Sequence, residues 1–504
     1  MRLVLGAAAV TLAVAGRSDG QTIFAQPYVQ PGPAAGPTGL DAKTILWLTD
    51  QTPGTFSVEY GWDGQAPRRA EPKRTAIDLK AAKASATTKP VAPPKDPDDP
   101  EANVAARAVG EQHYFRYAAD LSDLPPDTAV WYRVRLGSAL VREASFRTRS
   151  SADKAIRFVA VGDLANGKPG QDAVARQVGL AKPQFVVALG DIVYSAGRTS
   201  QYADHFWRTY TNPPAAAGAG AGDPNTLPLM ATVPFRVVLG NHDCDTSLST
   251  WPDALGAYYF FTAPANGPGL GKWSTPIGKD KADVAAFRAA AGDSYPALGF
   301  YSFDDGPAHF LVLDNNGYAK LDDPALLKWI ESDLTGSKAP WKFVCLHAPP
   351  FHTSPQHYTD QKTRLLVPLF EKCGVDVVWA GHVHNYQRSH PLKFTPAPRK
   401  PGDKLVNGTF ALDTKFDGKA VTKPDGVLYF VSGGGGGTLY KDPFEKAAES
   451  IRKKYGDGNF APYTAKHVAD RHSFVVCDLS PDRLTVRAVD ADGKEFDQVV
   501  VTKR

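Results

Sequence analysis

The sequence predicts an all-β domain followed by an α/β domain, with the change near residue 150. Before that point, β-type runs follow one another with little helical periodicity between them. From Ala155 onward, apolar runs alternate with loops and helical stretches, and polar residues follow the ends of the runs. A chain of 504 residues is also too long for a single core. We therefore predict domains at residues 23–150 and 151–504.

The first 22 residues have the pattern of an export signal. Arg2 supplies a positive start, and Leu3–Ala15 is a mostly apolar stretch that small and polar residues follow. About thirteen apolar residues are too few to span a bilayer as a helix, and no later segment is long and apolar enough. A buried helix is the alternative interpretation. The pattern favours a removable signal, and hence a secreted or periplasmic protein without a membrane span.

Composition favours a globular protein and disfavours a nucleic-acid-binding protein or a structural zinc site. Hydrophobic content of 43% is typical of a globular chain, and a net charge of +4 does not argue for nucleic acid. Cys345 and Cys373 lie in or just before apolar runs, so we expect buried thiols. Cys244 and Cys477 have no evident partner, and an oxidising compartment would permit one bridge. The lack of a Cys-x-x-Cys pair disfavours a structural zinc site.

The N-terminal region is predicted to be a β-sandwich. Its strand-like runs are Lys43–Thr49, Thr55–Trp62, His113–Ala119, Ala129–Leu136 and Glu143–Thr148. A proline-rich corner at Leu124–Thr128 leads into the aromatic run Trp131–Val134, as in sandwiches of the fibronectin type. The segment Leu79–Val109 is rich in Lys, Ala, Pro and Asp, and we expect a surface insertion there.

In the second region, several predicted strands end just before polar residues. They are Ile156–Val161, Phe185–Leu189, Phe235–Leu239, Phe310–Leu313, Phe343–Leu346 and Val375–Ala380. A helix is expected at Asp172–Ala181. α/β sheets bind their ligands at the carboxyl ends of strands, because the loops there leave the sheet and separate. Three segments rich in small residues and proline are expected to be surface loops: Pro213–Pro228, Gly267–Gly292 and Lys393–Pro424.

Five short segments at the ends of β-type runs carry residues that can bind metal. They are Val161-Gly162-Asp163, Gly190-Asp191-Ile192-Val193-Tyr194, Gly240-Asn241-His242-Asp243, Val344-Cys345-Leu346-His347 and Gly381-His382-Val383-His384. Alone, a Gly-Asp pair is usually a turn, and a tyrosine or histidine is usually packed or solvated. All five in one chain instead suit a pair of adjacent metal ions. Hydrolysis at phosphorus is the chemistry that such a pair favours.

The residue types indicate which ions would bind. The carboxylate of Asp191 has two oxygens and can bridge two cations roughly 3.5–4 Å apart. Neutral donors, such as the Asn241 amide and the His347 imidazole, suit Zn²⁺, Mn²⁺ or Fe²⁺. The Tyr194 phenol has an ordinary pKa of about 10, so binding as phenolate near neutrality favours a strong Lewis acid, Fe³⁺.

These segments resemble the signature set of the purple acid phosphatases, which belong to the calcineurin-like metallophosphoesterase superfamily. The continuation Asn385-Tyr386-Gln387-Arg388 is similar to that of the plant-type members. The resemblance covers most of the chain after the signal. It implies a fibronectin type III-like domain before a four-layer α/β/β/α metallophosphoesterase sandwich.

The resemblance also implies a role for each residue by position. Asp163, Tyr194 and His384 would bind Fe³⁺, Asp191 would bridge, and Asn241, His347 and His382 would bind a divalent Zn, Fe or Mn ion. His242 and His357 would face the substrate and protonate the leaving oxygen. Apart from the resemblance, we expect Asp243 to orient His242 through its other nitrogen, as carboxylates beside functional histidines do. The family pattern has a histidine pair where this chain has Gln356-His357, with His352 as a possible substitute. Gly433–Gly437 is expected to be a tight turn, because no P-loop lysine follows it.

The expected function is therefore a secreted acid phosphatase that hydrolyses small phosphate monoesters through a metal-bound hydroxide. A cationic histidine as acid and water activated by Fe³⁺ favour an acidic optimum. One alternative is a phosphodiesterase or nucleotide hydrolase with the same centre, and no sequence feature indicates specificity for nucleic acid. The other is a non-enzymatic adhesion module, which the complete ligand set disfavours.

Overall fold

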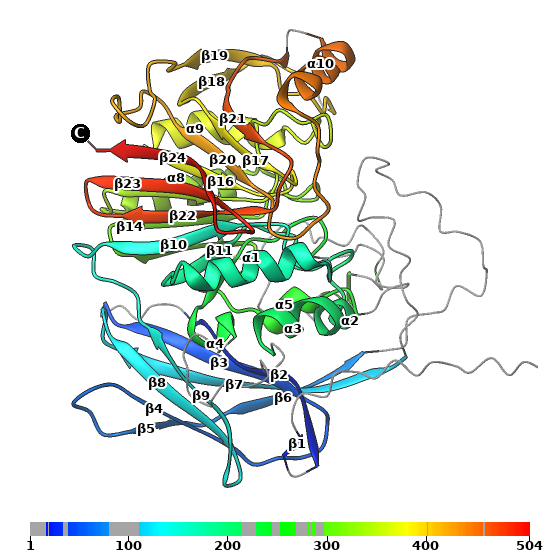
Figure 1. Ribbon diagram of the computed structural model, residues 1–504, viewed down its shortest axis with the longest axis vertical. Helices are drawn as coiled ribbons and strands as arrows, with labels where there is room; N and C mark the ends of the chain where they lie inside the picture. The colour runs from blue at the N-terminus through cyan, green and yellow to red at the C-terminus, as the bar shows by residue number, and fades with distance from the viewer. Residues whose placement is uncertain are drawn as a thin grey trace, which may run out of the picture.

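The fold was described from a computed structural model (Figure 1). The structure describes residues 17–18, 20–33, 39–79, 110–212, 228–243, 253–268, 281, 284–285, 287, 297–400, 402–456 and 459–503. An all-β part lies below a mixed α/β part in the view of Figure 1, as the sequence predicts.

The N-terminal part contains two antiparallel sheets. In order across sheet I, the strands are β1 (Arg17–Ser18), β2 (Gln21–Pro31), β3 (Asp41–Thr49), β7 (Gln112–Leu124) and β6 (Lys73–Leu79). In sheet II they are β5 (Arg68–Ala70), β4 (Phe56–Gly61), β8 (Ala129–Leu136) and β9 (Ala139–Arg147). Alternate residues of both sheets, such as Trp47 and Tyr132, are buried in the core between them.

Each strand predicted in this part is present, within a few residues of its predicted bounds. β1, β2, β5 and β6 were not predicted. β2 contains Pro27 and has register shifts on either side of Ala25, which disguise its alternation. β6 carries the mostly exposed sequence Lys73–Ala76 before its buried end. β2 also begins at Gln21, before the predicted domain start at residue 23.

The C-terminal part contains two larger sheets. In order across sheet III, the strands are β12 (Phe235–Val237), β11 (Phe185–Ala188), β10 (Ile156–Val161), β22 (Ser473–Leu479), β23 (Arg483–Asp490) and β24 (Glu495–Thr502). In sheet IV they are β13 (Phe300–Asp305), β14 (Ala308–Leu313), β15 (Trp341–Cys345), β16 (Val377–Ala380), β20 (Leu428–Ser432), β17 (Tyr386–Ser389) and β21 (Thr464–Val468). The strands that lead to the predicted ligand segments are parallel to one another within each sheet: β10, β11 and β12 in sheet III, and β15 and β16 in sheet IV.

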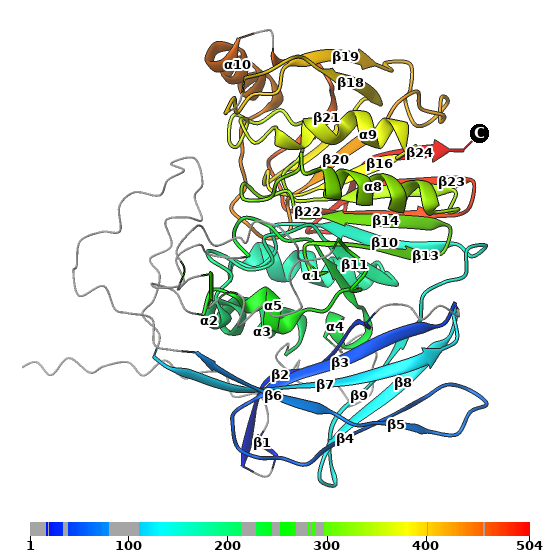
Figure 2. The same ribbon diagram turned by 180° about the vertical axis from the view of Figure 1, so that it is seen from behind.

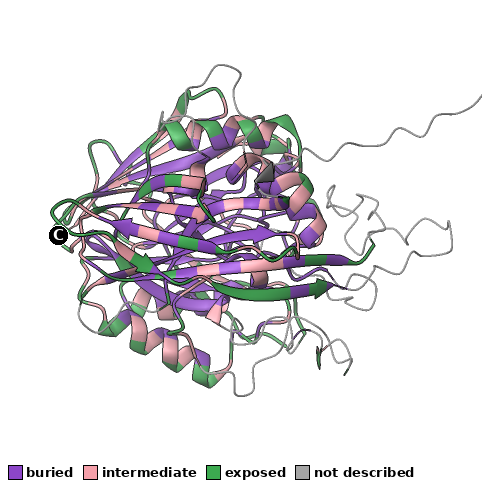
Figure 3. Ribbon diagram, turned by 90° about the horizontal axis from the view of Figure 1, so that it is seen from below, coloured by how far each residue is buried: buried purple, intermediate pink, exposed green. Residues whose placement is uncertain are grey.

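Helices cover the outer faces of both sheets, which gives the expected order of layers: helix, sheet, sheet, helix (Figures 1 and 2). The helices are α1 (Pro169–Leu180), α2 (Thr199–Gln201), a π-helical turn (Tyr202–Phe206), α3 (Trp207–Tyr210), α4 (Leu229–Thr232), α5 (Gly256–Phe260), α8 (Pro324–Gly336), a 3-10 turn (Lys362–Leu366), α9 (Val367–Lys372) and α10 (Phe444–Tyr455). α1, α3 and α5 pack on sheet III, and α8 and α9 pack on sheet IV. Aromatic and aliphatic side chains fill the space between the sheets, so the strands are largely buried (Figure 3).

The predicted strands and the predicted helix of this part are confirmed, but one predicted loop is wrong. Lys393–Pro424 contains β18 (Leu392–Pro396) and β19 (Gly408–Leu412), which pair as an antiparallel ribbon. Leu392 and Phe394 point into the core beside α9, and their alternation with exposed residues makes the segment a strand despite its prolines.

The two parts share a hydrophobic cluster. The face of sheet I that points away from sheet II packs against the helices over sheet III, and Tyr28 and Leu46 contribute to it. The Tyr28 hydroxyl donates to the Phe260 carbonyl across this interface, at 2.8 Å. Beside it, Lys43 forms a buried ion pair with Asp41.

Several predictions lie outside the described residues: most of the signal segment, the insertion after Leu79, much of the two loops beginning at Pro213 and Gly267, and Cys244. Cys345, Cys373 and Cys477 are free thiols and are buried. In the part of the chain that the structure describes, none of the helices has the length and apolarity needed to cross a membrane.

Candidate metal centre

The five predicted segments meet at one edge of the stacked sheets. β10, β11 and β12 deliver the first three segments from sheet III, and β15 and β16 deliver the other two from sheet IV. Because the strands are parallel within each sheet, their carboxyl ends open on the same side. The site is therefore built from both sheets of the sandwich.

One group of donor atoms gathers around Tyr194. Its hydroxyl lies 3.0 Å from Oδ1 of Asp163 and 2.9 Å from Nε2 of His384. The same imidazole nitrogen is 3.3 Å from that carboxylate. Nδ1 of His384 contacts the Thr438 carbonyl at 2.7 Å and must be its donor, so Nε2 keeps its lone pair for a cation.

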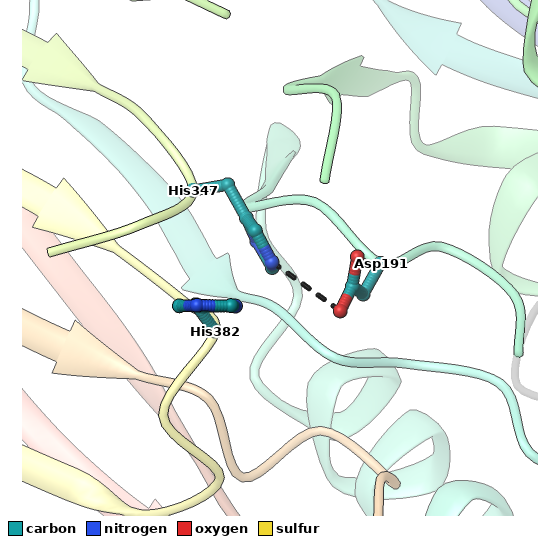
Figure 4. A group of neighbouring side chains, drawn as sticks. All are labelled: Asp191, His347 and His382. Carbon is teal, nitrogen blue, oxygen red and sulfur yellow. Dashed lines mark ion pairs between the residues drawn. The ribbon is translucent and has the colours of Figure 1, made fainter. Parts of the chain in front are cut away.

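A second group gathers around His347. Its Nε2 lies 3.0 Å from Oδ1 of Asn241 and 3.3 Å from Oδ2 of Asp191. Its Nδ1 donates to the Leu189 carbonyl at 2.7 Å, which again leaves Nε2 free to bind a cation. The ring of His382 lies beside it, with centroids 4.8 Å apart (Figure 4).

Asp191 belongs to both groups. One atom of Asp191, one of His347 and one of His382 lie within 4.8 Å of one another, and so do one atom each of Asp163, Asp191 and His384. All these residues are buried. The structure thus places Asp191 where the sequence predicts a bridging ligand.

The charges of the site fit cations. Burial alone raises the pKa of Asp191, but its histidine neighbours, His347 first, hold it well below the usual range. Conversely, burial lowers the pKa of His347, but the Asp191 charge outweighs burial and raises it to about 9. A proton is therefore favoured between these groups, where a metal ion would supply the same positive charge. Oxygen and imidazole donors of this mixture suit two metal ions.

The backbone of the ligand loops is held in an uncommon conformation. Asp163, Asp191 and His382 have φ values of 62°, 49° and 68°, in the left-handed region. Hydrogen bonds between the loops hold them there. The His382 N–H donates to Oδ2 of Asp163 at 2.9 Å, and the His242 N–H donates to Oδ1 of Asp191 at 2.8 Å. The carboxylates of Asp163 and Asp191 therefore also fix the neighbouring loops.

Glycines precede these ligands because the loops lie very close together. Gly190 has a φ of +87°, and a Cβ there would lie 2.4 Å from Nδ1 of His347. A Cβ on Gly240 would lie 2.1 Å from Oδ1 of Asp191. No side chain fits at either position without moving a predicted ligand.

His242 lies beside Tyr194, with ring centroids 4.9 Å apart. Its Nδ1 contacts the Ser195 carbonyl, whereas the sequence predicts an orienting contact from Asp243. The Asp243 carboxylate instead accepts hydrogen bonds from the Ile192 N–H at 2.8 Å and the Gly240 N–H at 2.7 Å. Asp243 thus fixes the ligand loops, and a main-chain carbonyl orients the imidazole.

His357, the second predicted substrate-facing histidine, is at the same site. Its ring centroid lies 4.0 Å from that of His382, and its Nε2 is 3.0 Å from the Tyr440 hydroxyl. The Tyr440 ring stacks on His384 at 4.4 Å. Oδ2 of Asp360 lies 3.1 Å from Nε2 of His382 and 3.7 Å from Nδ1 of His357.

Tyr440 and Asp360 were missed in the sequence. Asp360 follows His357 by three positions, a spacing that brings it back toward that histidine in a turn. Tyr440 follows the glycine run, and no pattern there points to the site. Its position becomes visible only when the strands are assembled.

Two other predictions concern neighbouring segments. Gly433–Gly437 was predicted to be a tight turn, but its N–H groups bond to other loops. The Gly435 N–H donates to the Gly162 carbonyl at 3.1 Å, and the Gly437 N–H donates to the Asp163 carbonyl at 2.8 Å. His352 is buried, and burial lowers its pKa to about 3. Burial therefore disfavours the protonated ring that a substitute for the missing histidine would need.

Comparison with known proteins indicates a phosphoesterase domain. Residues 156–386 match the family model described as calcineurin-like phosphoesterase. The chain is 27% identical to "Purple acid phosphatase 1" of Ipomoea batatas over 284 residues, which is 55% of this chain and 52% of the relative. It is 24% identical to "Fe(3+)-Zn(2+) purple acid phosphatase 12" of Arabidopsis thaliana over 358 residues, which is 68% of this chain and 61% of the relative. The chain thus spans between half and two thirds of the length of these relatives.

A solved structure supports the fold. The purple acid phosphatase PPD1 from yellow lupin seeds superposes with a TM-score of 0.60 at 17% identity, over 94% of this chain and 74% of the lupin chain. The superposition includes both the all-β part and the α/β part, because it covers nearly all of the chain. The chain therefore has a calcineurin-like phosphoesterase domain and is a homologue of the purple acid phosphatases.

Proposed function

We propose that this protein is a secreted, dinuclear-metal acid phosphatase that hydrolyses small phosphate monoesters. The observation that carries the proposal is the convergence of the predicted donor atoms into two buried groups that share Asp191. Burying carboxylates, imidazoles and a phenol together costs free energy, and a bound cation would offset that cost.

The residues divide between two ions. Asp163, Tyr194 and His384 would hold Fe³⁺, because only a strong Lewis acid makes the phenol a good ligand near neutrality. Asn241, His347 and His382 would hold a divalent Zn, Fe or Mn ion, with Asp191 between the ions. The Arabidopsis relative is named for Fe(3+) and Zn(2+), which supports this pair. When bound, two cations would offset the charge of a phosphate ester and activate a water molecule.

The proton for the leaving oxygen would come from His242. Its Nδ1 must donate to the Ser195 carbonyl, so Nε2 is the nitrogen that carries the transferable proton. His357 would bind the phosphate or assist the transfer from beside His382. An imidazolium acid favours an acidic optimum, because the protonated form is lost as the pH rises.

The remaining assignments are part of the same proposal. Residues 1–22 would contain the signal that directs export, although Arg17–Ser18 and Gln21–Thr22 of this segment pair with each other in sheet I. Residues 23–150 would be a fibronectin type III-like domain. Residues 151–504 would be the catalytic domain. The paired antiparallel sheets I and II support the second assignment.

Metal analysis with a visible spectrum tests the centre. We expect about two metal ions per chain and a broad charge-transfer band that disappears in Tyr194→Phe. Tyr28→Phe, which removes a buried hydroxyl that donates to the Phe260 carbonyl and belongs to none of the predicted ligand segments, should keep the band. A colourless but active dimetal protein would contradict the ferric phenolate. Failure to retain metal would contradict the enzyme and favour a binding module.

A panel of esters tests the substrate class. Monoesters should be hydrolysed much faster than diesters and nucleotides, and Asp191→Ala should abolish all turnover because both ions lose a ligand. Faster turnover of diesters would favour the phosphodiesterase alternative with the same centre.

A further inference from the structure

We propose that Asp360 is a positioning residue shared by His382, a ligand of the divalent ion, and His357, the second substrate-facing histidine. The proposal rests on the proposed function, because it assigns a role to a residue beside that centre. It is carried by the contacts of one carboxylate oxygen, Oδ2, with both imidazoles.

The contact with His382 is a hydrogen bond. Oδ2 of Asp360 lies 3.1 Å from Nε2, and a carboxylate can only accept, so Nε2 carries the proton. The lone pair of the ring is then on Nδ1, which becomes the nitrogen available to a cation. Carboxylates that hold metal-binding histidines in this way fix the tautomer and orientation of the ring and raise its basicity.

The contact with His357 is longer and electrostatic. Nδ1 lies 3.7 Å from Oδ2 of Asp360, while Nε2 lies 3.0 Å from the Tyr440 hydroxyl. The imidazole is therefore held from both sides. Tyr440 is itself fixed by stacking on His384, with the two rings 4.4 Å apart and 7° from parallel.

The backbone explains why Asp360 reaches both rings. Its N–H donates to the His357 carbonyl at 2.9 Å, which closes a turn and returns the carboxylate over that residue. His357 has a φ of 57°, in the left-handed region, so the turn is well defined. The Asp360 side chain is 50% exposed, whereas that of His382 is 6% exposed. Asp360 therefore lies at the rim of the site and holds a ligand at its floor.

This arrangement links metal binding to proton donation. If His382 turns, the same carboxylate moves relative to His357, because one oxygen atom contacts both rings. Asp360 should thus affect the affinity of the divalent ion and the efficiency of leaving-group protonation together. The ferric side should be unaffected, because the Asp360 carboxylate contacts His357 and His382, which both lie on the divalent side.

Competition with a chelator for Zn²⁺ tests the proposal in the purified, iron-loaded protein. Asp360→Ala should bind Zn²⁺ about 10–100-fold more weakly than wild type, as removal of such a partner usually does. Asp360→Asn should lie between them, since the amide keeps an acceptor but loses the charge. The Tyr194 charge-transfer band should keep its position and intensity. Hydrolysis of an alkyl phosphate should fall more than that of an activated aryl phosphate under saturating Zn²⁺.

Asp304→Ala is the matched control. Asp304 also contacts a histidine, with Oδ1 2.8 Å from Nδ1 of His309, and its side chain is 58% exposed. Asp304 lies on β13, away from the predicted ligand segments. The Asp304→Ala protein should therefore bind Zn²⁺ as tightly as wild type. Equal Zn²⁺ affinity in Asp360→Ala and wild type would overturn the proposal. So would loss of the ferric band in Asp360→Ala, which would indicate a general disturbance. Wild-type protein that binds no Zn²⁺ would instead overturn the proposed function.

Discussion

The imidazole of His242 takes its orientation from the main chain. Nδ1 is held by the Ser195 carbonyl, which immediately follows the predicted ligand Tyr194. A carbonyl only accepts, so it fixes the proton on Nδ1 at any pH at which the ring is neutral. The nitrogen that faces away from this contact is then the one that gains and loses the second proton.

His242→Ala should therefore slow esters with poor leaving groups far more than esters with good ones. General acid catalysis contributes roughly 10²–10⁴-fold, and an activated aryl phosphate needs little of it. Steady-state rates for an alkyl phosphate and a nitrophenyl phosphate would measure the difference. His113→Ala, on the surface of the N-terminal part, is a control that should change neither rate. Equal losses on both esters would show that His242 is not the acid.

At the scale of elements, four of the predicted ligands, Asp163, Asp191, Asn241 and His382, directly follow a glycine near a strand end. Gly240→Ala would place a methyl group 2.1 Å from Oδ1 of Asp191, so one of the two loops must shift. A shift of about 1 Å can reduce turnover on the order of 10²-fold. Gly179→Ala in α1 meets no atom within 4 Å and should leave activity unchanged. Metal content and turnover of both variants would check this, and full activity of Gly240→Ala would show that the loops tolerate separation.

A second element-scale feature joins sheet IV to α8. Burial lowers the pKa of His309, but hydrogen bonds from its ring to Asp304 and Asp333, both at 2.8 Å, outweigh burial and raise it to about 9. The folded state thus favours the protonated ring. The protonated His309 ring stabilises the folded state fully below its ordinary pKa of 6.5, and this stabilisation is lost as the pH rises through about 9.

The quantity to measure is the difference in unfolding free energy between wild type and His309→Gln. This difference should fall by on the order of 2 kcal/mol between pH 6 and pH 9.5, a value discounted for the exposure of Asp304. Denaturant titrations at both pH values would give it, and the subtraction removes groups that titrate in both proteins. A difference independent of pH would mean that the ring is not protonated in the folded state.

The elements that precede the site were predictable because their signal is local. Apolar runs such as Phe185–Ala188 end at a glycine and a ligand, and this pattern needs no knowledge of the fold. β18 and β19 were hidden by glycine and proline, although Leu392 and Phe394 alternate with exposed residues. The contacts of Ser195, Asp360 and Tyr440 depend on loops that meet only after the sheets pack, so sequence spacing carries little information about them.

At the scale of the whole molecule, the two sheets of the sandwich share the proposed ions. Asp163, Asp191 and Asn241 come from sheet III, and His347, His382 and His384 come from sheet IV. Ions bound between them would stabilise the folded state by mass action, by about 4 kcal/mol at a concentration 1,000 times the dissociation constant.

Removal of the metals should consequently lower the unfolding temperature, by on the order of 5 °C for a chain of this size. Calorimetry of the metal-loaded and chelated protein would measure the change. Addition of Zn²⁺ and iron should restore the original temperature, while Mg²⁺ alone should not, because imidazole and phenolate ligands do not suit it. An unchanged unfolding temperature would mean that the donor groups do not join the sheets through metal.

The apolar face of sheet I makes the two parts of the chain depend on each other for folding. Tyr28 and Leu46 are covered by helices that belong to the phosphoesterase half, and that half reciprocally relies on the sheet to shield its aromatic side chains. We therefore expect that neither half folds stably without the other. Truncation at residue 150 would expose an apolar surface on each fragment. In the intact protein, both parts should unfold together in a single cooperative step.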